Sequence, residues 1–316
     1  MWNLARQLAA LGVLGINRRN ADFTLAHNPR RLYPLVDNKL QTKSIAAQAG
    51  IPIPELYGVI ETEYQVRHLP ELLSKHPDFV IKPARGSGGD GILVIAGRAH
   101  DRYRTVSGYT ITQDELAHQV FDILSGLYSL GGLSDQAMIE YRVQFDPIFE
   151  PITYHGAPDI RIIVYLGVPV MAMLRLPTRA SNGKANLHQG ALGVGLDLAT
   201  GATLATAVCR QEILMEHPDT GDSLDGLEIP HWEDLLRLAA RCYEVSGLGY
   251  LGVDIVLDRF KGPLLLELNA RPGLAIQIAN GAGLLPRVRL VDECHQALDG
   301  VEARLAFARE HFAVSS

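Results

Sequence analysis

Cysteine, basic blocks and long apolar runs are scarce in this chain, and each scarcity argues against a class of protein. The 316 residues include 3 cysteines, which stand far apart at positions 209, 242 and 294. Their odd number and wide spacing favour reduced thiols in a cytoplasmic protein over a disulfide framework or a cysteine metal site. No apolar run is long enough to span a bilayer.

The charge balance argues against nucleic acid as a partner. There are 29 basic and 35 acidic residues, for a formal net charge of −6, and no large basic block. The chain is 47% hydrophobic and 20% charged, which is typical of a globular enzyme. Its length is sufficient for two or three lobes with a well-buried core.

A short helical lead is predicted over residues 1–36. Its apolar stretch Leu4–Ile16 is interrupted by Arg6 and Gln7 and is too short to span a bilayer. No signal-peptide cleavage pattern follows it. We expect an amphipathic helix packed on the body of the protein, with an interfacial membrane contact as the alternative.

From residue 37 onward, helical and strand patterns follow one another irregularly. Asp37 is expected to cap the first helix, and Lys39 near its start opposes the helix dipole, which indicates either a functional role or a misplaced surface lysine. Hairpin-paired strands with interspersed helices favour the α+β class over a regular βαβ array. The expected helices are 37–50, 63–75, 112–130, 230–245, 285–298 and 302–312, and the expected strands are 56–60, 78–82, 92–96, 136–143, 159–166, 168–176, a pair or edge within 196–210, and the hairpin strands 253–257 and 263–268.

Three polar residues interrupt the two apolar strands of the last hairpin. Glu267 and Asn269 are two apart, so they project from one face of their strand, and Asp254 can meet them from the partner strand. Two carboxylates and an amide oxygen form a set that suits Mg²⁺ beside nucleotide phosphates. The alternative is a strand whose acids face solvent.

The stretch Gly86–Gly91 matches the pattern G-x-G-x-x-G, but a strand follows it where a dinucleotide-binding fold needs a helix. The P-loop spacing is absent as well, and the lysine precedes the glycines, unlike the order in protein kinases. We therefore expect a glycine-rich hairpin lid whose backbone amides and Lys82 hold phosphates. A mobile hairpin with a surface lysine is the alternative.

These elements, taken in order, resemble the ATP-grasp superfamily. The closest likeness is to the α-L-glutamate ligase-like branch, which includes ribosomal-protein glutamate ligases, with a short lead as in sugar-transfer-associated ATP-grasp proteins. The motifs that carry the resemblance are Asp37-Asn-Lys39, Phe79-Val-Ile-Lys82-Pro, the lid Arg85–Gly91, Met138-Ile-Glu140-Tyr-Arg-Val143, Asp159-Ile-Arg161, Arg175, Asn186-Leu-His188-Gln-Gly190, Asp254 and Glu267-Leu-Asn269.

The resemblance implies an ATP-grasp fold of two α+β lobes that clasp ATP. It divides the chain into the lead 1–36, an N-terminal lobe 37–143 with the lid, a C-terminal lobe 144–300 with the magnesium site, and a C-terminal helix 301–316. His188 is equally consistent with a core or capping residue and with an active-site residue. The residues implied for ATP are Lys39, Lys82, Arg85, Gly86, Ser87, Gly88, Gly89, Gly91, Glu140 (for the adenine amine), Tyr141, Val143 and Glu150 (for the ribose); those for the phosphate and acyl-phosphate region are Arg161, Arg175, Asn186 and Arg271; those for metal are Asp254, Glu267 and Asn269.

The implied activity is an ATP-dependent carboxylate–amine ligase that forms an amide through an acyl phosphate, with two Mg²⁺ ions or Mn²⁺ as a substitute. The substrates would be a small-molecule or peptide carboxylate and an amine, with glutamate or another amino acid added to a peptide or envelope component. The alternatives are a phosphotransferase of the same fold and a nucleotide-gated, non-catalytic partner of a membrane or envelope assembly. Two departures concern the substrate: the lead of about 36 residues is shorter than the usual preceding domain, and Ala191 replaces a glycine of the glutamate ligases.

Overall fold

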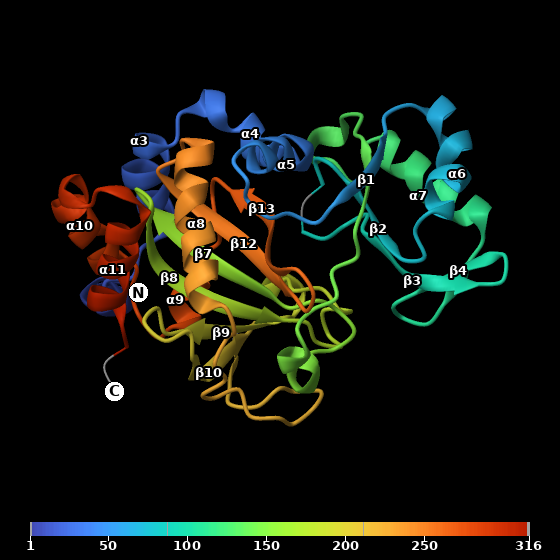
Figure 1. Ribbon diagram of the computed structural model, residues 1–316. Coiled ribbons are helices and arrows are strands. Elements are labelled where there is room, and N and C mark those ends of the chain that lie inside the picture. Colours follow the sequence, from blue (N-terminus) through green and yellow to red (C-terminus); the bar gives the residue numbers. More distant parts are fainter. Residues whose placement is uncertain (1, 87, 211, 315–316) are drawn as a thin grey trace. The chain divides into compact units, whose positions relative to one another are not determined.

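A computed structural model describes residues 2–86, 88–210 and 212–314, which divide into two compact units (Figure 1). The larger unit comprises Met1–Asp37, Ser44–Pro52 and Phe145–Ser316. The smaller unit comprises Asn38–Lys43 and Ile53–Gln144. Each unit is built on its own antiparallel sheet, as the expected α+β class requires.

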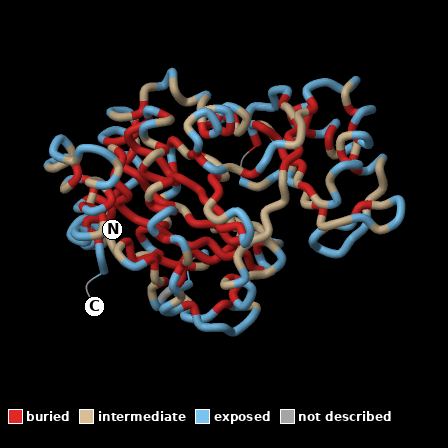
Figure 2. The backbone as a smooth tube through the Cα atoms, viewed as in Figure 1, coloured by how far each residue is buried: buried red, intermediate tan, exposed pale blue. Residues whose placement is uncertain are grey.

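The larger unit is organised around a seven-stranded sheet in the order β11-β10-β9-β8-β7-β12-β13. Figure 2 shows the buried backbone following these central strands. Every residue of β8 and β12 is buried, which explains why both read as nearly continuous apolar runs. The strands are β7 (Asp159–Tyr165), β8 (Val168–Leu176), β9 (Leu192–Leu196), β10 (Thr203–Cys209), β11 (Glu212–Leu214), β12 (Tyr250–Asp258) and β13 (Gly262–Asn269).

Helices α8 (Trp232–Ser246) and α11 (Gly300–Phe312) pack against this sheet and against each other. Figure 1 shows α8 lying across β7 and β12. The helix buries Leu235, Leu236 and Ala239 at helical spacing, so its apolar stripe faces the sheet. The remaining helices of this region are α9 (Ile276–Ala279) and α10 (Leu285–Cys294).

The lead is helical, as expected, but its first helix does not pack as expected. The described side chains of residues 6–11 are all exposed, and the chain first packs against the body between Gly12 and Leu14. There the backbone of Leu14 exchanges hydrogen bonds with the buried side chain of Gln277. The lead consists of α1 (Trp2–Ala10), α2 (Ile16–Arg18), a π-helical stretch Arg19–Thr24, α3 (Leu25–His27), a 3-10 turn Arg30–Leu32 and α4 (Pro34–Asp37).

No helix in the described part of the chain is both long and apolar enough to cross a membrane.

The smaller unit has a six-stranded sheet in the order β1-β6-β2-β3-β4-β5. Strands β2 and β3 form the predicted hairpin around the glycine-rich stretch. The strands of the smaller unit are β1 (Leu56–Ile60), β2 (Phe79–Pro83), β3 (Leu93–Ala99), β4 (Arg102–Thr105), β5 (Thr110–Ile111) and β6 (Ala137–Glu140). Its sheet is accompanied by helices α6 (Leu69–Ser74) and α7 (Gln113–Leu124).

Three expected helix boundaries are wrong, each for a local reason. Helix α5 (Lys39–Gln48) is capped by Asn38, whose Oδ1 accepts from the Leu40 amide at 2.9 Å, while Asp37 ends α4. Residues 63–68 form a 3-10 helix, and α6 begins where Pro70 occupies its first turn. Helix α7 ends six residues early because Gly126 adopts a φ of +85°, with no room for a Cβ beside the carbonyl of Leu133.

Gly156 fixes the loop that carries Asn186, because a Cβ at Gly156 would lie 1.8 Å from the carbonyl oxygen of Gly183. Gly156→Ala should therefore lower the free energy of unfolding by about 1–3 kcal/mol or more. Urea unfolding followed by circular dichroism measures the change. Gly15→Ala is the control, because a Cβ there meets nothing within 4 Å; equal stability of the two variants would contradict the tight contact.

Candidate active site

A row of charged side chains crosses one face of the large sheet. In the strand register, Asp159 on β7 lies opposite Arg175 on β8, and Arg161 on β7 lies opposite Asp254 on β12. Asp254 in turn lies opposite Glu267 on β13. Because Asp159 and Arg161 are two residues apart, alternation places the whole row on the same face.

Two arginines hold the buried carboxylate of Asp254. Arg161 donates to both of its oxygens, from Nε at 2.7 Å and from Nη2 at 2.5 Å. Arg175 donates from Nη2 to Asp254 at 2.8 Å and pairs in two places with Asp159, at 2.5 and 2.7 Å. Such bidentate pairs orient the guanidinium groups rigidly.

The network separates the acidities of its two aspartates. Burial raises the pKa of Asp159 to about 6; Arg175 opposes this shift and Asp254 adds to it. Burial would also raise the pKa of Asp254, but the attraction of Arg161 and Arg175 outweighs it and holds that pKa below its usual range. Asp254 is therefore the carboxylate that stays ionised most firmly.

The three predicted metal ligands come together on β12 and β13. Asn269 Nδ2 lies 3.3 Å from Asp254 Oδ2 and 3.3 Å from Glu267 Oε1. A β-bulge lies between Asp254 and Ile255, so that Glu267 faces Asp254 while Leu265 faces Ile255. Within the described residues there is no metal-holding group of three or more His, Cys, Asp or Glu side chains; this set has two carboxylates and one amide.

The smaller unit contains a second cluster of buried charges. Glu140, at the end of β6, pairs through Oε1 with Lys82 Nζ at 2.5 Å and through Oε2 with Lys43 Nζ at 2.8 Å. Lys43 Nζ also donates to the carbonyl of Pro54 at 2.6 Å. All three side chains are more than 90% buried, and together they carry one net positive charge, which suits a phosphate.

Burial alone would raise the pKa of Glu140, but the attraction of Lys82 and Lys43 outweighs it and lowers that pKa. Burial also lowers the pKa of Lys43, against the pull of Glu140. Glu140 is thus held ionised between two ammonium groups.

The glycine-rich stretch is anchored at its start. The buried carboxylate of Asp135 accepts from the Arg85 amide at 3.1 and 3.0 Å and from Ser129 Oγ at 2.6 Å. Lys39 Nζ donates to the Gly86 carbonyl at 2.5 Å. Gly88, Gly89 and Gly91 all have positive φ, as a lid built from glycine requires, whereas Ser87 lies outside the described residues.

The structure also shows the surroundings of the remaining predicted residues. The Tyr141 amide donates to the Glu55 carbonyl, and Val143 is half-buried two residues beyond it. The Arg271 guanidinium stacks over the ring of Tyr33 at 5.2 Å. Glu150 is exposed on a 3-10 turn, Asn186 caps the 3-10 turn Leu187–Gln189 by accepting from the His188 amide, and His188 is exposed, which argues against a core position for it.

Sequence reasoning missed Lys43, Asp135 and Asp159 as members of these clusters. Asp159 had a usable signal, because it stands two residues before Arg161 at the start of a buried strand. Lys43 stands four residues after Lys39, so the two share one side of α5. Asp135 gave no such signal, because it lies in a loop that is far along the sequence from the glycine-rich stretch it anchors.

Comparison with known families decides the identity of this architecture. A model described as sugar-transfer associated ATP-grasp matches residues 18–293. The chain belongs to the ATP-grasp superfamily. The predicted superfamily and the predicted fold are therefore confirmed.

The individual proteins to which the chain is similar share little sequence identity with it. The ribosomal protein bS6–L-glutamate ligase of Salmonella paratyphi B is 24% identical over 252 residues, which cover 79% of this chain but 61% of the relative, less than two thirds of its length. The D-cycloserine synthetase DcsG is 15% identical, with a TM-score of 0.48 over 84% of this chain and 72% of that one. A D-alanine–D-alanine ligase from Bacillus anthracis is 14% identical, with a TM-score of 0.43 over 88% and 67%. The family assignment rests on the family model alone.

Glu140→Gln should destabilise the protein by roughly 3–5 kcal/mol, because it leaves two buried ammonium groups without a counter-charge. Lys43→Met should cost less, since Glu140 then keeps Lys82 as its partner. Urea unfolding followed by circular dichroism compares the two variants. Equal losses would contradict the pairing.

The ion pairs of Glu140 with Lys43 and Lys82 also predict how the stability of the protein depends on pH. The folded pKa of Glu140 lies below its unfolded value, so its contribution to stability is complete above about pH 4.3 and is lost as pH falls through the folded pKa. The stability difference between the natural protein and Glu140→Gln should be constant from pH 7 to about 5 and shrink below about pH 4. A difference that grows on acidification would overturn this assignment.

Proposed function

We propose that this protein is an ATP- and Mg²⁺-dependent ligase that joins a carboxylate to an amine and releases ADP and phosphate. The observation that carries the proposal is the convergence of Asp254, Glu267 and Asn269 beside Arg161 and Arg175 in an ATP-grasp chain. A nucleotide-binding scaffold without catalysis has no need for such a set. The proposed location is the cytoplasm.

In this proposal the smaller unit binds ATP. Lys82 and Lys39 contact its phosphates, and the glycine-rich stretch, with Arg85 at its start, covers them. Because both carboxylate oxygens of Glu140 engage lysines, we assign adenine recognition chiefly to the backbone of residues 140–143. Glu150, which belongs to the larger unit, is proposed for the ribose hydroxyls, in keeping with its exposure.

The donor set of the larger unit fits a hard divalent cation, because carboxylate and amide oxygens are the ligands that Mg²⁺ prefers. Asp254, Glu267 and Asn269 would hold it, with one or two ions. Bound Mg²⁺ would neutralise phosphate charge. Asp254 would have a second task, since it also fixes Arg161 and Arg175, the two arginines that we assign to the reacting groups.

The reaction then follows from charge. A substrate carboxylate oxygen attacks the γ-phosphorus, the bond to the ADP oxygen breaks, and an acyl phosphate forms. The amine attacks the acyl carbon, inorganic phosphate leaves, and the amine proton passes to phosphate or solvent. Arg175 and Arg161 are proposed to stabilise the charged transition states, with Arg271 and Asn186 proposed at the edge of the same region.

Amino acids and peptides are the proposed substrate class, glutamate and envelope peptides among them, since the curated relative is named as a glutamate ligase. The experiment measures ADP and phosphate release with Mg-ATP over a panel of amino acids, peptides and envelope fragments, with mass spectrometry of products. A product lighter by one water than its two precursors supports the ligase. A phosphorylated product without an amide favours the phosphotransferase, and ATP binding without turnover on any pair favours the non-catalytic partner.

Glu267→Gln should reduce turnover by roughly 100-fold or more and raise the Mg²⁺ concentration needed for half-maximal rate, because one anionic metal ligand is lost. It is a cleaner test than Asp254→Asn, which also releases two buried arginines. Glu293→Gln, an exposed glutamate on α10, is the matched control and should leave both values unchanged. Full activity of Glu267→Gln would remove Glu267 from the metal site.

A further inference from the structure

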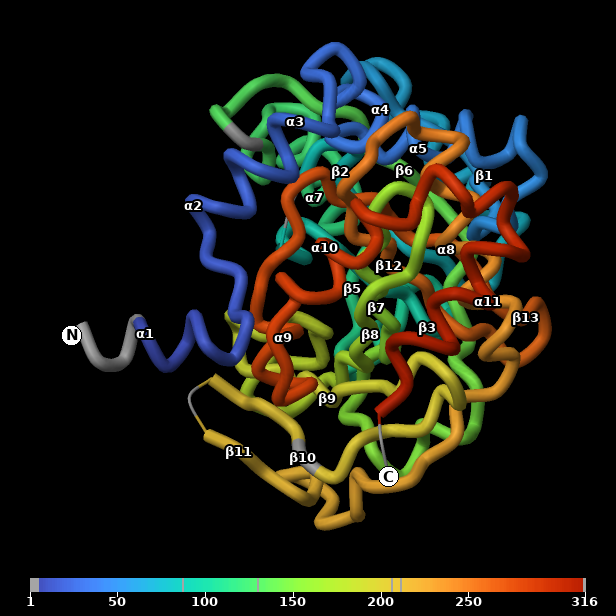
Figure 3. The backbone as a smooth tube through the Cα atoms, turned by 90° about the vertical axis from the view of Figure 1, so that its left-hand side faces the viewer, coloured from blue at the N-terminus to red at the C-terminus, as the bar shows by residue number. Residues whose placement is uncertain are grey.

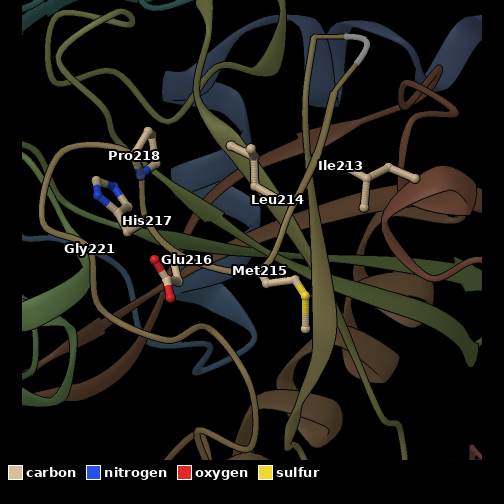
Figure 4. Close-up of a pocket in the computed structure, with 7 residues that line it drawn as sticks. All are labelled: Ile213, Leu214, Met215, Glu216, His217, Pro218 and Gly221. Carbon is tan, nitrogen blue, oxygen red and sulfur yellow. The ribbon is translucent and has the colours of Figure 1, made fainter.

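The first helix of the lead is uncovered. In α1 and the residue after it, Leu8 is 41% and Leu11 is 66% exposed, and further along the lead Ile16 is 62% and Leu25 is 58% exposed. Figure 3 shows α1 extending from the rest of the larger unit, with α2 and α3 on the same side. The lead thus presents several large aliphatic side chains to the surroundings.

The junction after α1 is held tightly against the body of the larger unit. A Cβ at Gly283 would lie 2.2 Å from backbone atoms of Gly12, and a Cβ at Gly12 would lie 2.6 Å from Pro286. The Leu285 amide also donates to the Gly12 carbonyl. The chain therefore leaves the body at a tightly packed point, and α1 has only nine residues beyond it.

A helix of that length without packing is marginal in water. Most of the stability of a short amphipathic helix comes from a surface that covers its apolar side. Since no described part of this chain covers residues 6–11, the covering surface has to come from elsewhere.

The charge of the lead indicates what that surface is. Residues 1–31 contain five arginines and one aspartate, out of 29 basic and 35 acidic residues in the whole chain, so a segment of net charge +4 belongs to a protein whose remainder is −10. Arg6, Arg30 and Arg31 are exposed, whereas Arg18 pairs with Asp22 and Arg19 is buried against the Pro272 carbonyl. The covering surface should therefore have an apolar interior for the aliphatic side chains and an anionic outer layer for the arginines.

We propose that the lead, residues 6–31, binds the surface of a bilayer that contains anionic phospholipid. Leucines and isoleucine interspersed with arginines form the pattern of helices that lie in the headgroup region without crossing the membrane. Each exposed arginine adds attraction to anionic headgroups, and this attraction falls with salt. One short helix anchors weakly, so the binding is reversible.

Sedimentation of the full-length protein with vesicles tests this. Vesicles of phosphatidylcholine with about 30–40% phosphatidylglycerol, which gives them an anionic surface, are compared with vesicles of pure phosphatidylcholine, at low and high NaCl. We expect binding to the mixed vesicles, at least ten-fold weaker on pure phosphatidylcholine, and weakened by salt. The double variant Leu8→Glu, Leu11→Glu should reduce binding at least ten-fold.

The matched control is Leu127→Glu with Leu133→Glu, two leucines of the smaller unit that are 65% and 63% exposed. This variant should bind vesicles as the natural protein does. Equal binding of both double variants, or binding independent of lipid charge, would overturn the proposal. A dimer in light scattering that is lost with Leu8→Glu, Leu11→Glu would overturn it too, in favour of a second copy as the covering surface. None of these readouts depends on ATP turnover.

Discussion

A carboxylate taken out of water needs a partner, and the ion pairs of Asp254 are the constraint on which this protein's candidate chemistry depends. The residue is almost fully buried in the middle of a sheet, where an unpaired charge would be very costly. Arg161 and Arg175 from two further strands supply the compensation, and Asp159 balances Arg175 in turn. Three strands are therefore joined by one row of ion pairs, and the groups that would face a reacting phosphate are fixed by the same contacts that compensate the buried charges.

Alternation along strands made much of this row predictable. Asp254, Glu267 and Asn269 could be placed together from residue spacing and hairpin pairing, and in the structure Asn269 Nδ2 lies 3.3 Å from each of the two carboxylates. The partners of Asp254 could not be derived in this way, because register between strands far apart in sequence depends on loop lengths and bulges. The family resemblance supplied Arg161 and Arg175, and Asp159 was missed although it shares their face.

Helix boundaries and buried lysines show a second limit of what the sequence alone predicts. The switch from Asp37 to Asn38 as cap depends on one turn of α4 that composition does not reveal. The burial of Lys43 depends on the acid at the end of β6, nearly a hundred residues later. A lysine reads as a surface residue until its partner is known, so long-range pairing is what sequence patterns leave out.

The bulge at Leu266 has a consequence for how this hairpin could change in length. Because one extra residue sits between Leu265 and Glu267, strand β13 changes phase there: the segment before it keeps its leucines inward, and the segment after it turns an acid and an amide toward Asp254. Losing that single residue would restore a regular ladder, with Leu265 still opposite Ile255 and Glu267 still opposite Asp254. The hairpin can therefore lose this residue and keep its acids paired, whereas loss of Leu268 would put Glu267 and Asn269 on opposite faces of the strand.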